Sequence, residues 1–241
     1  MIAPRTGAGL ALAITRRGAG HALNDDRYAL LDARNLVVRE AGRGVLYAAA
    51  DGVTSAGNGF AAAELACEAL AELFTSSRAA SEELLIDLIE SADAQVRLTT
   101  SSACTLAGLW MSAGQGRVFC LGDTAVLRWQ RGKLTRLTPK QVRGRGLAAY
   151  VGMGGQVRHA LFLDRLYLQP EDVFIIATDG LLHVVPEEEL AALLEADANP
   201  TTLIEQVHAR LHAAPVPDDA TFVICRVDNP YGFPMAPARR G

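Results

Sequence analysis

Four short apolar runs follow one another closely in the middle of the chain. They cover residues 104–111, 117–122, 125–130 and 133–137, and are separated by turn-forming segments such as "SAGQG" and "RGK". Connections this short join antiparallel strands, because a parallel crossover needs a dozen or more residues. The middle of the chain therefore predicts an antiparallel ladder of strands.

The segments on either side of this ladder alternate between strand-like and helix-like patterns. Further strands are predicted at 10–15, 27–31, 36–38, 45–50, 161–168, 172–178 and 220–227. Apolar residues at helical spacing predict helices over 58–74 and 81–98, the second opening on Ser81 as N-cap. Two more helices are indicated by Pro186 before three glutamates and by Asn199-Pro200. This order is typical of an α+β fold with largely antiparallel sheets and helix pairs packed outside.

Composition narrows the classes of protein. Of 241 residues, 50% are hydrophobic and 21% charged, which argues against a disordered chain. The net charge is −4, and no basic block is long enough to follow a phosphate backbone, so we expect no nucleic-acid partner. We expect one domain over 1–228 and a loose Pro/Gly/Arg-rich tail over 229–241.

The cysteines and the N-terminal segment bear on the compartment. The four cysteines lie far apart in apolar stretches without metal-ligand spacing, so we interpret them as reduced core thiols of a cytoplasmic protein. The apolar run over 9–14 is too short to span a bilayer, and no convincing signal-peptide cleavage site follows it. We therefore expect no membrane association.

Several apolar runs end on an aspartate, as in "VLYAAADGV" (45–53), "VFCLGDT" (118–124) and "ATDGLL" (177–182). A single Asp-Gly pair after a strand is more often a plain turn. Carboxylates gathered in one cleft would repel one another, however, and Mg²⁺ or Mn²⁺ would remove that cost. A glycine after the acid also lets its backbone carbonyl approach a metal. The combination predicts a site built from Asp25, Asp51, Asp123, Asp179 and Asp218.

In order and spacing, these motifs resemble the metal-dependent protein phosphatases of the PPM (type 2C) family, from about residue 12 to about residue 227. The stretches that carry the resemblance are "HALNDD" (21–26), "AADGVTSAGNGFAAAELA" (49–66), the Thr and Gly-Asp block over 101–138, "ATDGLL" (177–182) and "DDAT" (218–221). The resemblance implies two antiparallel sheets in a central sandwich, flanked by helix pairs. It is closest to compact bacterial members, with a shortened flap over 138–159.

The resemblance also implies a site with two Mn²⁺ or Mg²⁺ ions and catalytic Asp51, Asp179 and Asp218. Asp51 would bridge both ions, and Asp179 and Asp218 would bind the first. Asp25 and the Gly52 carbonyl would serve the second, and Asp123 a third. A hydroxide that bridges the two metals would hydrolyse phosphoserine or phosphothreonine without a covalent intermediate.

Two of the positions that depart from the family pattern are histidines. His21 stands where the family has a phosphate-binding Arg, so we expect phosphate to contact His21 or the basic loop residues Arg143, Arg145 and Arg158. His183 stands where many members have another metal-binding Asp, although His can itself bind Mn²⁺.

Three functional hypotheses follow. The first is a Mg²⁺/Mn²⁺-dependent protein serine/threonine phosphatase that opposes a bacterial-type Ser/Thr kinase, with that kinase or its target as phosphorylated partner. A variant acts on one dedicated partner in signalling or secretion control. The second is a catalytically impaired phosphatase-like domain that binds phosphoproteins or a kinase as a regulator. The third is a metal-dependent hydrolase of a small phosphoester.

Overall fold

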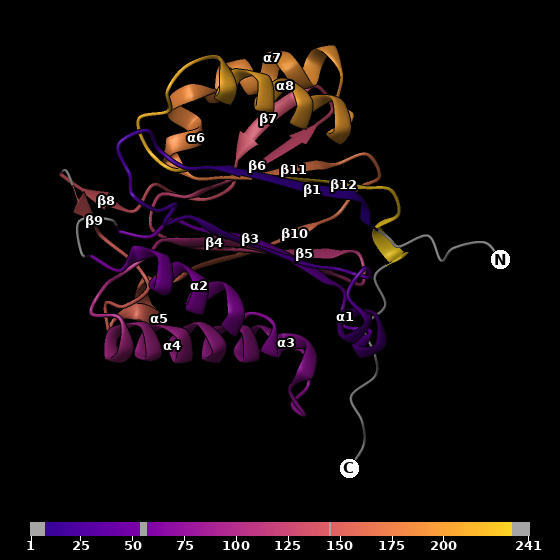
Figure 1. The fold of residues 1–241 in the computed structure, drawn as a ribbon. Helices are drawn as coiled ribbons and strands as arrows, with labels where there is room; N and C mark the ends of the chain where they lie inside the picture. The colour runs from indigo at the N-terminus through magenta and orange to yellow at the C-terminus, as the bar shows by residue number, and fades with distance from the viewer. Residues whose placement is uncertain (1–7, 54–56, 145, 233–241) are drawn as a thin grey trace.

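The computed structural model describes residues 8–53, 57–144 and 146–232, and shows two five-stranded antiparallel sheets packed face to face (Figure 1). The first sheet has the order β1 (Ala8–Arg16), β12 (Ala220–Val227), β11 (Val173–Ala177), β6 (Ala125–Gln130) and β7 (Lys133–Arg136). The second has the order β10 (Phe162–Tyr167), β5 (Gln115–Leu121), β4 (Leu106–Ser112), β3 (Val45–Ala50) and β2 (Arg27–Leu31). A small separate hairpin consists of β8 (Val142–Arg143) and β9 (Gly146–Leu147).

The predicted antiparallel ladder is confirmed, but it is shared between the two sheets. β4 pairs with β5 in the second sheet, whereas β6 pairs with β7 in the first. The chain therefore crosses from one sheet to the other between Leu121 and Ala125, which is the segment that contains Asp123.

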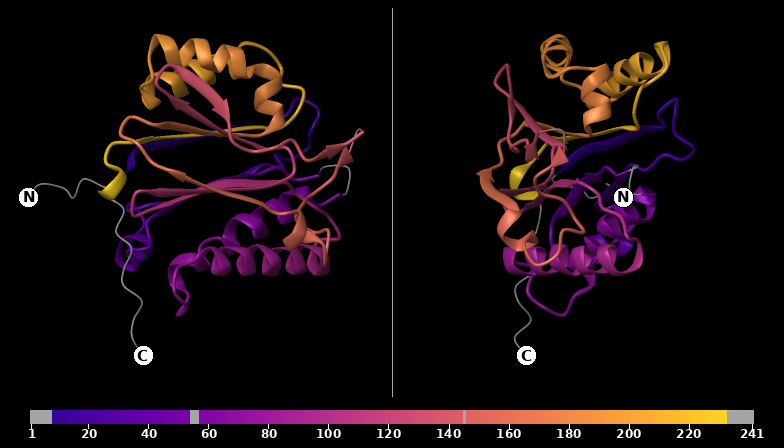
Figure 2. Two further views of the ribbon diagram at one scale, coloured as in Figure 1. Left: turned by 180° about the vertical axis from the view of Figure 1, so that it is seen from behind. Right: turned by 90° about the vertical axis from the view of Figure 1, so that its left-hand side faces the viewer.

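Helices cover both outer faces of the sandwich, and the two further views keep the same layering (Figure 2). On the side of the second sheet lie α1 (Leu36–Ala41), α2 (Gly59–Ala69), α3 (Glu72–Thr75), α4 (Glu82–Thr99) and α5 (Val157–Ala160). On the side of the first sheet lie α6 (Asp179–Val184), α7 (Glu187–Ala196) and α8 (Pro200–Ala213). Buried apolar side chains form three clusters, one between the sheets and one under each helical layer.

Two predicted helix starts are confirmed by their caps. The Ser81 hydroxyl accepts a hydrogen bond from the Leu84 amide at the start of α4. The Asn199 side chain accepts from the Thr201 amide at the start of α8, with Pro200 as the first helical residue. In both places the cap residue satisfies an amide that has no partner inside the helix.

The strand predicted over 36–38 is wrong, because this segment is the helix α1. The Asn35 side chain caps it by accepting from the Val37 amide, and Gly42 ends it with a φ of 60°. A left-handed residue of this kind is a common helix stop that glycine adopts without strain. These local signals prevail over the β-propensity of two adjacent valines.

The C-terminal segment is described only in part. Residues 233–241 lie outside the described residues, so the expected loose tail is followed only to Gly232. Pro230–Gly232 form a short 3₁₀ turn, and the Pro230 carbonyl accepts from the Gly114 amide in the β4–β5 turn. None of the helices in the described ranges combines the length and the apolar character that crossing a bilayer requires.

Candidate metal centre

The predicted acids gather where strands of both sheets end on one side of the sandwich. Asp51 directly follows β3, and Asp123 lies in the crossing from β5 to β6. Asp179 is the first residue of α6 just beyond β11, and Asp218 lies two residues before β12. All four line one cleft with a volume of about 860 Å³. The gathering of these residues, predicted from the ends of apolar runs, is therefore observed.

Asp51 is held in place through its backbone. Its amide donates to the Thr105 hydroxyl at 3.0 Å, and its carbonyl accepts from the Thr105 amide at 2.8 Å. The Thr105 hydroxyl is also 2.6 Å from the hydroxyl of Thr124, which lies in the crossing between the sheets. This buried hydroxyl pair fixes the end of β3 relative to the start of β6.

The electrostatics of the cleft disfavour ionised carboxyls as long as no cation is bound. Burial raises the pKa of Asp51 well above its usual range, and the nearby charges of Asp26, Asp179 and Asp218 raise it further. Burial and the charge of Asp179 also raise the pKa of Asp123. A bound cation would remove both causes, because it replaces the lost hydration and offsets the like charges.

Asp26 lies behind these acids and was not singled out in the sequence. It is fully buried, and burial raises its pKa to about 7. Its Oδ2 accepts from the Thr178 hydroxyl at 2.9 Å, whereas its buried Oδ1 has no hydrogen-bond partner among the described residues. The second aspartate of "NDD" was the available signal, because successive side chains of an extended segment point in opposite directions and one of two adjacent acids then faces the interior.

Asp25 and Gly52 lie beside each other at the start of α2. The Asp25 carboxylate is largely buried, does not line the cleft and accepts from the Phe60 amide at 3.1 Å. A Cβ on Gly52 would lie 2.4 Å from the backbone of Gly59 and 2.8 Å from the Asp25 carbonyl. Only glycine fits here, and Gly52 itself lines the cleft.

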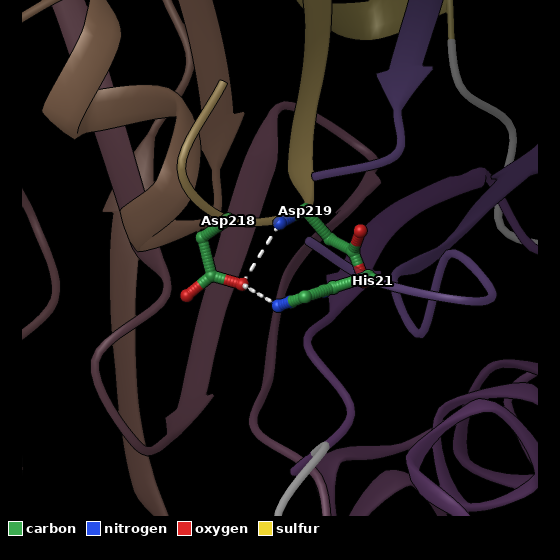
Figure 3. A group of neighbouring side chains, drawn as sticks. All are labelled: His21, Asp218 and Asp219. Atoms are coloured by element: carbon green, nitrogen blue, oxygen red, sulfur yellow. Dashed lines mark hydrogen bonds and ion pairs between the residues drawn. The ribbon is translucent and has the colours of Figure 1, made fainter. Parts of the chain in front are cut away.

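His21 lies between two consecutive aspartates (Figure 3). Its Nε2 is 3.6 Å from Asp218 Oδ1, and its Nδ1 is 3.1 Å from Asp219 Oδ2. The Asp219 carboxylate beside it raises the pKa of His21, which favours the charged imidazolium. Sequence reasoning also missed Asp219, whose carboxylate accepts from the amides of Gly18 and Asp25. His21 therefore lies in the cleft, with its ring already engaged by these acids.

The structure does not bring Arg143 and Arg158, two of the predicted basic residues of the 138–159 loop, into the cleft. Arg158 forms ion pairs with three acids of α4, namely Glu83, Asp87 and Glu90. Arg143 is exposed on β8 and is absent from the cleft lining, although the adjacent Val142 contributes to it. Arg145 lies outside the described residues. His183 is exposed in the last turn of α6 and does not line the cleft either.

The donor set fits divalent cations. The buried Oδ1 atoms of Asp26 and Asp179 have no hydrogen-bond partner among the described residues, although buried polar atoms nearly always have one. The acidic side chains here offer carboxylate oxygens as metal ligands, and Mg²⁺ and Mn²⁺ prefer oxygen ligands of this kind. His21, Asp218 and Asp219 also bring potential ligand atoms within 4.8 Å of one another.

A family model described as protein phosphatase 2C matches residues 17–214 of the chain. No curated protein matches the sequence.

Solved structures of other proteins show the same fold. PppA, described as a key regulatory component of T6SS in Pseudomonas aeruginosa, is 22% identical with a TM-score of 0.75, over 90% of this chain and 96% of that one. The PPM Ser-Thr phosphatase MsPP from Mycobacterium smegmatis is 21% identical with a TM-score of 0.72, over 92% and 99%. The catalytic domain of PstP, solved with two manganese ions, is 19% identical with a TM-score of 0.71, over 91% and 98%.

Proposed function

The chain belongs to the protein phosphatase 2C family, and from this premise we propose that it is a Mg²⁺/Mn²⁺-dependent protein serine/threonine phosphatase. The observation that supports the proposal most is the cleft itself. Four carboxylates from both sheets line it, and burial with mutual repulsion raises the pKa values of Asp51 and Asp123. A cleft of this kind is costly for the fold unless cations bind there.

We propose that Asp51, Asp179 and Asp218 bind the catalytic ions, with Asp25 and the Gly52 carbonyl at the second ion. Two such ions would supply an activated water near neutral pH and would offset charge on the phosphoryl group. The protein holds its ligands rigidly for this purpose. Thr105 fixes the backbone of Asp51, and a Cβ on Gly180 would lie 2.0 Å from the Asp219 carbonyl, so only glycine lets α6 approach β12 this closely.

Asp123 is the candidate ligand for a third ion, because it lines the same cleft. His183, the other candidate for that ion, is exposed outside the cleft lining. We therefore propose two ions as the working set, with the third depending on Asp123.

The proposed partners are phosphorylated proteins in the bacterial cytoplasm, such as a Ser/Thr kinase or its target. The similarity in fold to PppA supports the variant in which one dedicated partner in secretion control is dephosphorylated. A cleft open enough for a folded phosphoprotein agrees with the short segment between β7 and β10, which contains the small β8–β9 hairpin and α5.

A second candidate is a domain that binds phosphoproteins without hydrolysing them. The contacts of His21 favour it, because the ring lies against Asp218, one of the proposed ligands. The buried acids behind the cleft argue against it, since a fold that no longer uses metal would gain stability by losing them.

The full chain is tested with p-nitrophenyl phosphate and a phosphothreonine peptide, with and without Mn²⁺, and Mn²⁺ binding is measured by calorimetry. We expect Mn²⁺-dependent hydrolysis in the wild type and at least about a 100-fold loss in Asp179→Asn, because even outer partners of metal ligands are worth about 10–100-fold. Asp164→Asn, an exposed position on β10, is the matched control and should be unaffected. Mn²⁺ binding without hydrolysis would favour the binding domain. Hydrolysis that survives Asp179→Asn would refute the proposed site.

A further inference from the structure

The charged side chains that line the cleft are mostly acidic. Among the described lining residues, the basic side chains are His21 and Arg97. A phosphoester brings a dianion into this cleft, and dianions in proteins are commonly held by cationic hydrogen-bond donors. His21 already lies against Asp218 and Asp219. This leaves Arg97 as the basic side chain of the described lining that is free to bind an anion.

Arg97 is exposed in the last turn of α4, and its guanidinium makes no hydrogen bond or ion pair with any residue that the structure describes. Its side-chain stem lies along the 152–154 segment, where the Cδ and Nε atoms are 3.6 and 3.7 Å from the position of a Cβ on Gly154. Arg136, which lies near the cleft, differs from Arg97. Arg136 donates to the carbonyls of Asp123 and Thr138 and pairs with Glu187.

Hydrogen bonds hold the C-terminal end of α4, which carries Arg97, against the 151–154 segment. Asp93, one turn earlier on α4 and 3% exposed, accepts from the amides of Gly152 and Gly154 at 2.7 and 3.0 Å. The next segment is tied to the loop that follows α4, because Cys104 and Val151 exchange both backbone hydrogen bonds. Gly152 needs its φ of 105° to make this turn. Arg97 thus projects from a rigid helix end beside a fixed loop.

We propose that Arg97 binds the phosphoryl oxygens of the substrate in this cleft. The inference rests on the proposed phosphatase function and assigns its substrate contact to a residue outside the sequence motifs. A guanidinium presents parallel N–H donors that match two oxygens of a phosphate, which a lysine ammonium cannot reproduce. The ordinary alternative is that Arg97 only stabilises the C-terminal end of α4 by its charge.

The chain offers a matched control for that alternative. Arg39 is also an exposed arginine in the last turn of a helix, α1, and lies outside the cleft lining. Any effect of removing a helix-end charge should therefore appear in Arg39→Ala as well as in Arg97→Ala.

The Mn²⁺-loaded wild type, Arg97→Ala, Arg97→Lys and Arg39→Ala are compared in three measurements. These are KM and kcat for p-nitrophenyl phosphate and for a phosphothreonine peptide, the Kd for inorganic phosphate by calorimetry, and Tm. We expect Arg97→Ala to raise KM for both substrates and the phosphate Kd by about tenfold or more, the scale of a hydrogen bond to a charged group. Arg97→Lys should recover part of this loss. Arg39→Ala should match the wild type in KM and Kd, and both alanine variants should have similar Tm.

An unchanged phosphate Kd in Arg97→Ala would overturn the proposal, and so would a KM effect limited to the peptide, which would place Arg97 against another part of the substrate. Failure of the proposed phosphatase activity can be distinguished from failure of the proposed role of Arg97. A wild type that binds phosphate without hydrolysing either substrate would refute the phosphatase, while the phosphate Kd of Arg97→Ala would still decide the role of Arg97.

Discussion

An aspartate lies at each end of strand β11, and the surroundings of the two aspartates differ. Asp172, just before the strand, is 1% exposed, and its carboxylate accepts from Arg128, Gln130 and the Gln169 amide. Asp179, just after the strand, has a buried Oδ1 with no hydrogen-bond partner among the described residues, and it faces the charge of Asp51. One end satisfies its acid from the chain itself. The other leaves one oxygen of its acid without a partner among the described residues, beside the carboxyl of Asp51.

The same contrast extends to the layer behind the cleft. Asp93 accepts from two glycine amides, whereas Asp26 keeps a buried oxygen without a partner in the described part of the chain. Buried acids therefore need not indicate a functional site. Buried acids whose oxygens stay unsatisfied favour one, because a cation that binds there offsets that cost.

The largest effect on the free energy of unfolding is expected when the aspartates at the two ends of β11 are replaced one at a time, in protein stripped of metal with EDTA. Asp172→Asn should lower the free energy of unfolding by about 3–5 kcal/mol, because it leaves the Arg128 charge without its partner in a largely buried place. Asp179→Asn should leave the stability of the metal-free protein unchanged or raise it, because it removes a repelling charge. Urea unfolding of both variants measures the difference. Similar losses in both would show that the two acids are equally well satisfied.

The next effect concerns pH. The pKa of Asp26 is about 7 in the folded protein, against an ordinary value of 3.8, so the folded state holds this proton more tightly than the unfolded state. The resulting stability is fully present below about pH 4 and is lost as the pH rises towards 7. A pKa difference of one between the two states corresponds to about 1.4 kcal/mol, so the loss is on the order of a few kcal/mol. Unfolding free energies of metal-free protein, determined from about pH 4 to about pH 8, measure it.

Asp26→Asn serves as the control for this pH dependence, because it removes the titrating group. It should make the slope shallower, with the remaining slope coming from Asp51 and Asp123, whose pKa values are also raised. Saturating Mn²⁺ should also make the slope shallower in the wild type. A slope that is the same in the wild type and in Asp26→Asn would contradict the assignment of the pH dependence to Asp26.

Sequence patterns were sufficient for the antiparallel strand pairing and for the acids that line the cleft. Short turns between apolar runs predicted antiparallel pairing, and acids at strand ends predicted where Asp51 and Asp179 lie, because strand ends are local properties of the chain. The family resemblance supplied the sandwich. Helix α1 was missed because a cap and a left-handed glycine decide it rather than propensity.

The basic residues were harder to predict, because a side chain's partner depends on contacts distant in sequence. Arg158 was expected in the cleft but pairs with α4 acids about 70 residues earlier in the chain. Arg97 was not singled out, since nothing in "AQVRLTT" (94–100) distinguishes it from a solvated helix residue. Asp219 stood out in the sequence only as the neighbour of Asp218, and its contacts with Gly18 and Asp25 appear only in three dimensions.

A smaller effect on stability and activity is expected at Thr105, whose buried hydroxyl contacts both Thr124 and the Asp51 amide. Thr105→Val keeps the shape but removes the acceptor of the Asp51 amide and the contact with Thr124. We expect a loss of about 1–3 kcal/mol in unfolding free energy and about tenfold in kcat/KM. Thr135→Val, at an exposed position on β7, is the matched control. A stability loss without a change in Mn²⁺-dependent activity would show that Thr105 supports the fold but not the position of Asp51.

The smallest effect is expected at Arg158, which pairs with acids at the protein surface. Its guanidinium pairs with Glu83, Glu90 and Asp87 of α4, yet the arginine and all three acids are partly exposed to water, where ion pairs contribute little. Arg158→Ala should therefore leave Tm nearly unchanged, because solvation replaces the lost pairs. KM for p-nitrophenyl phosphate should also stay at the wild-type value, because the side chain is held against α4 and away from the cleft lining. Steady-state kinetics and a thermal melt measure both quantities. A raised KM with an unchanged Tm would restore Arg158 as a phosphate contact, and would mean that the α4 acids release it when substrate binds.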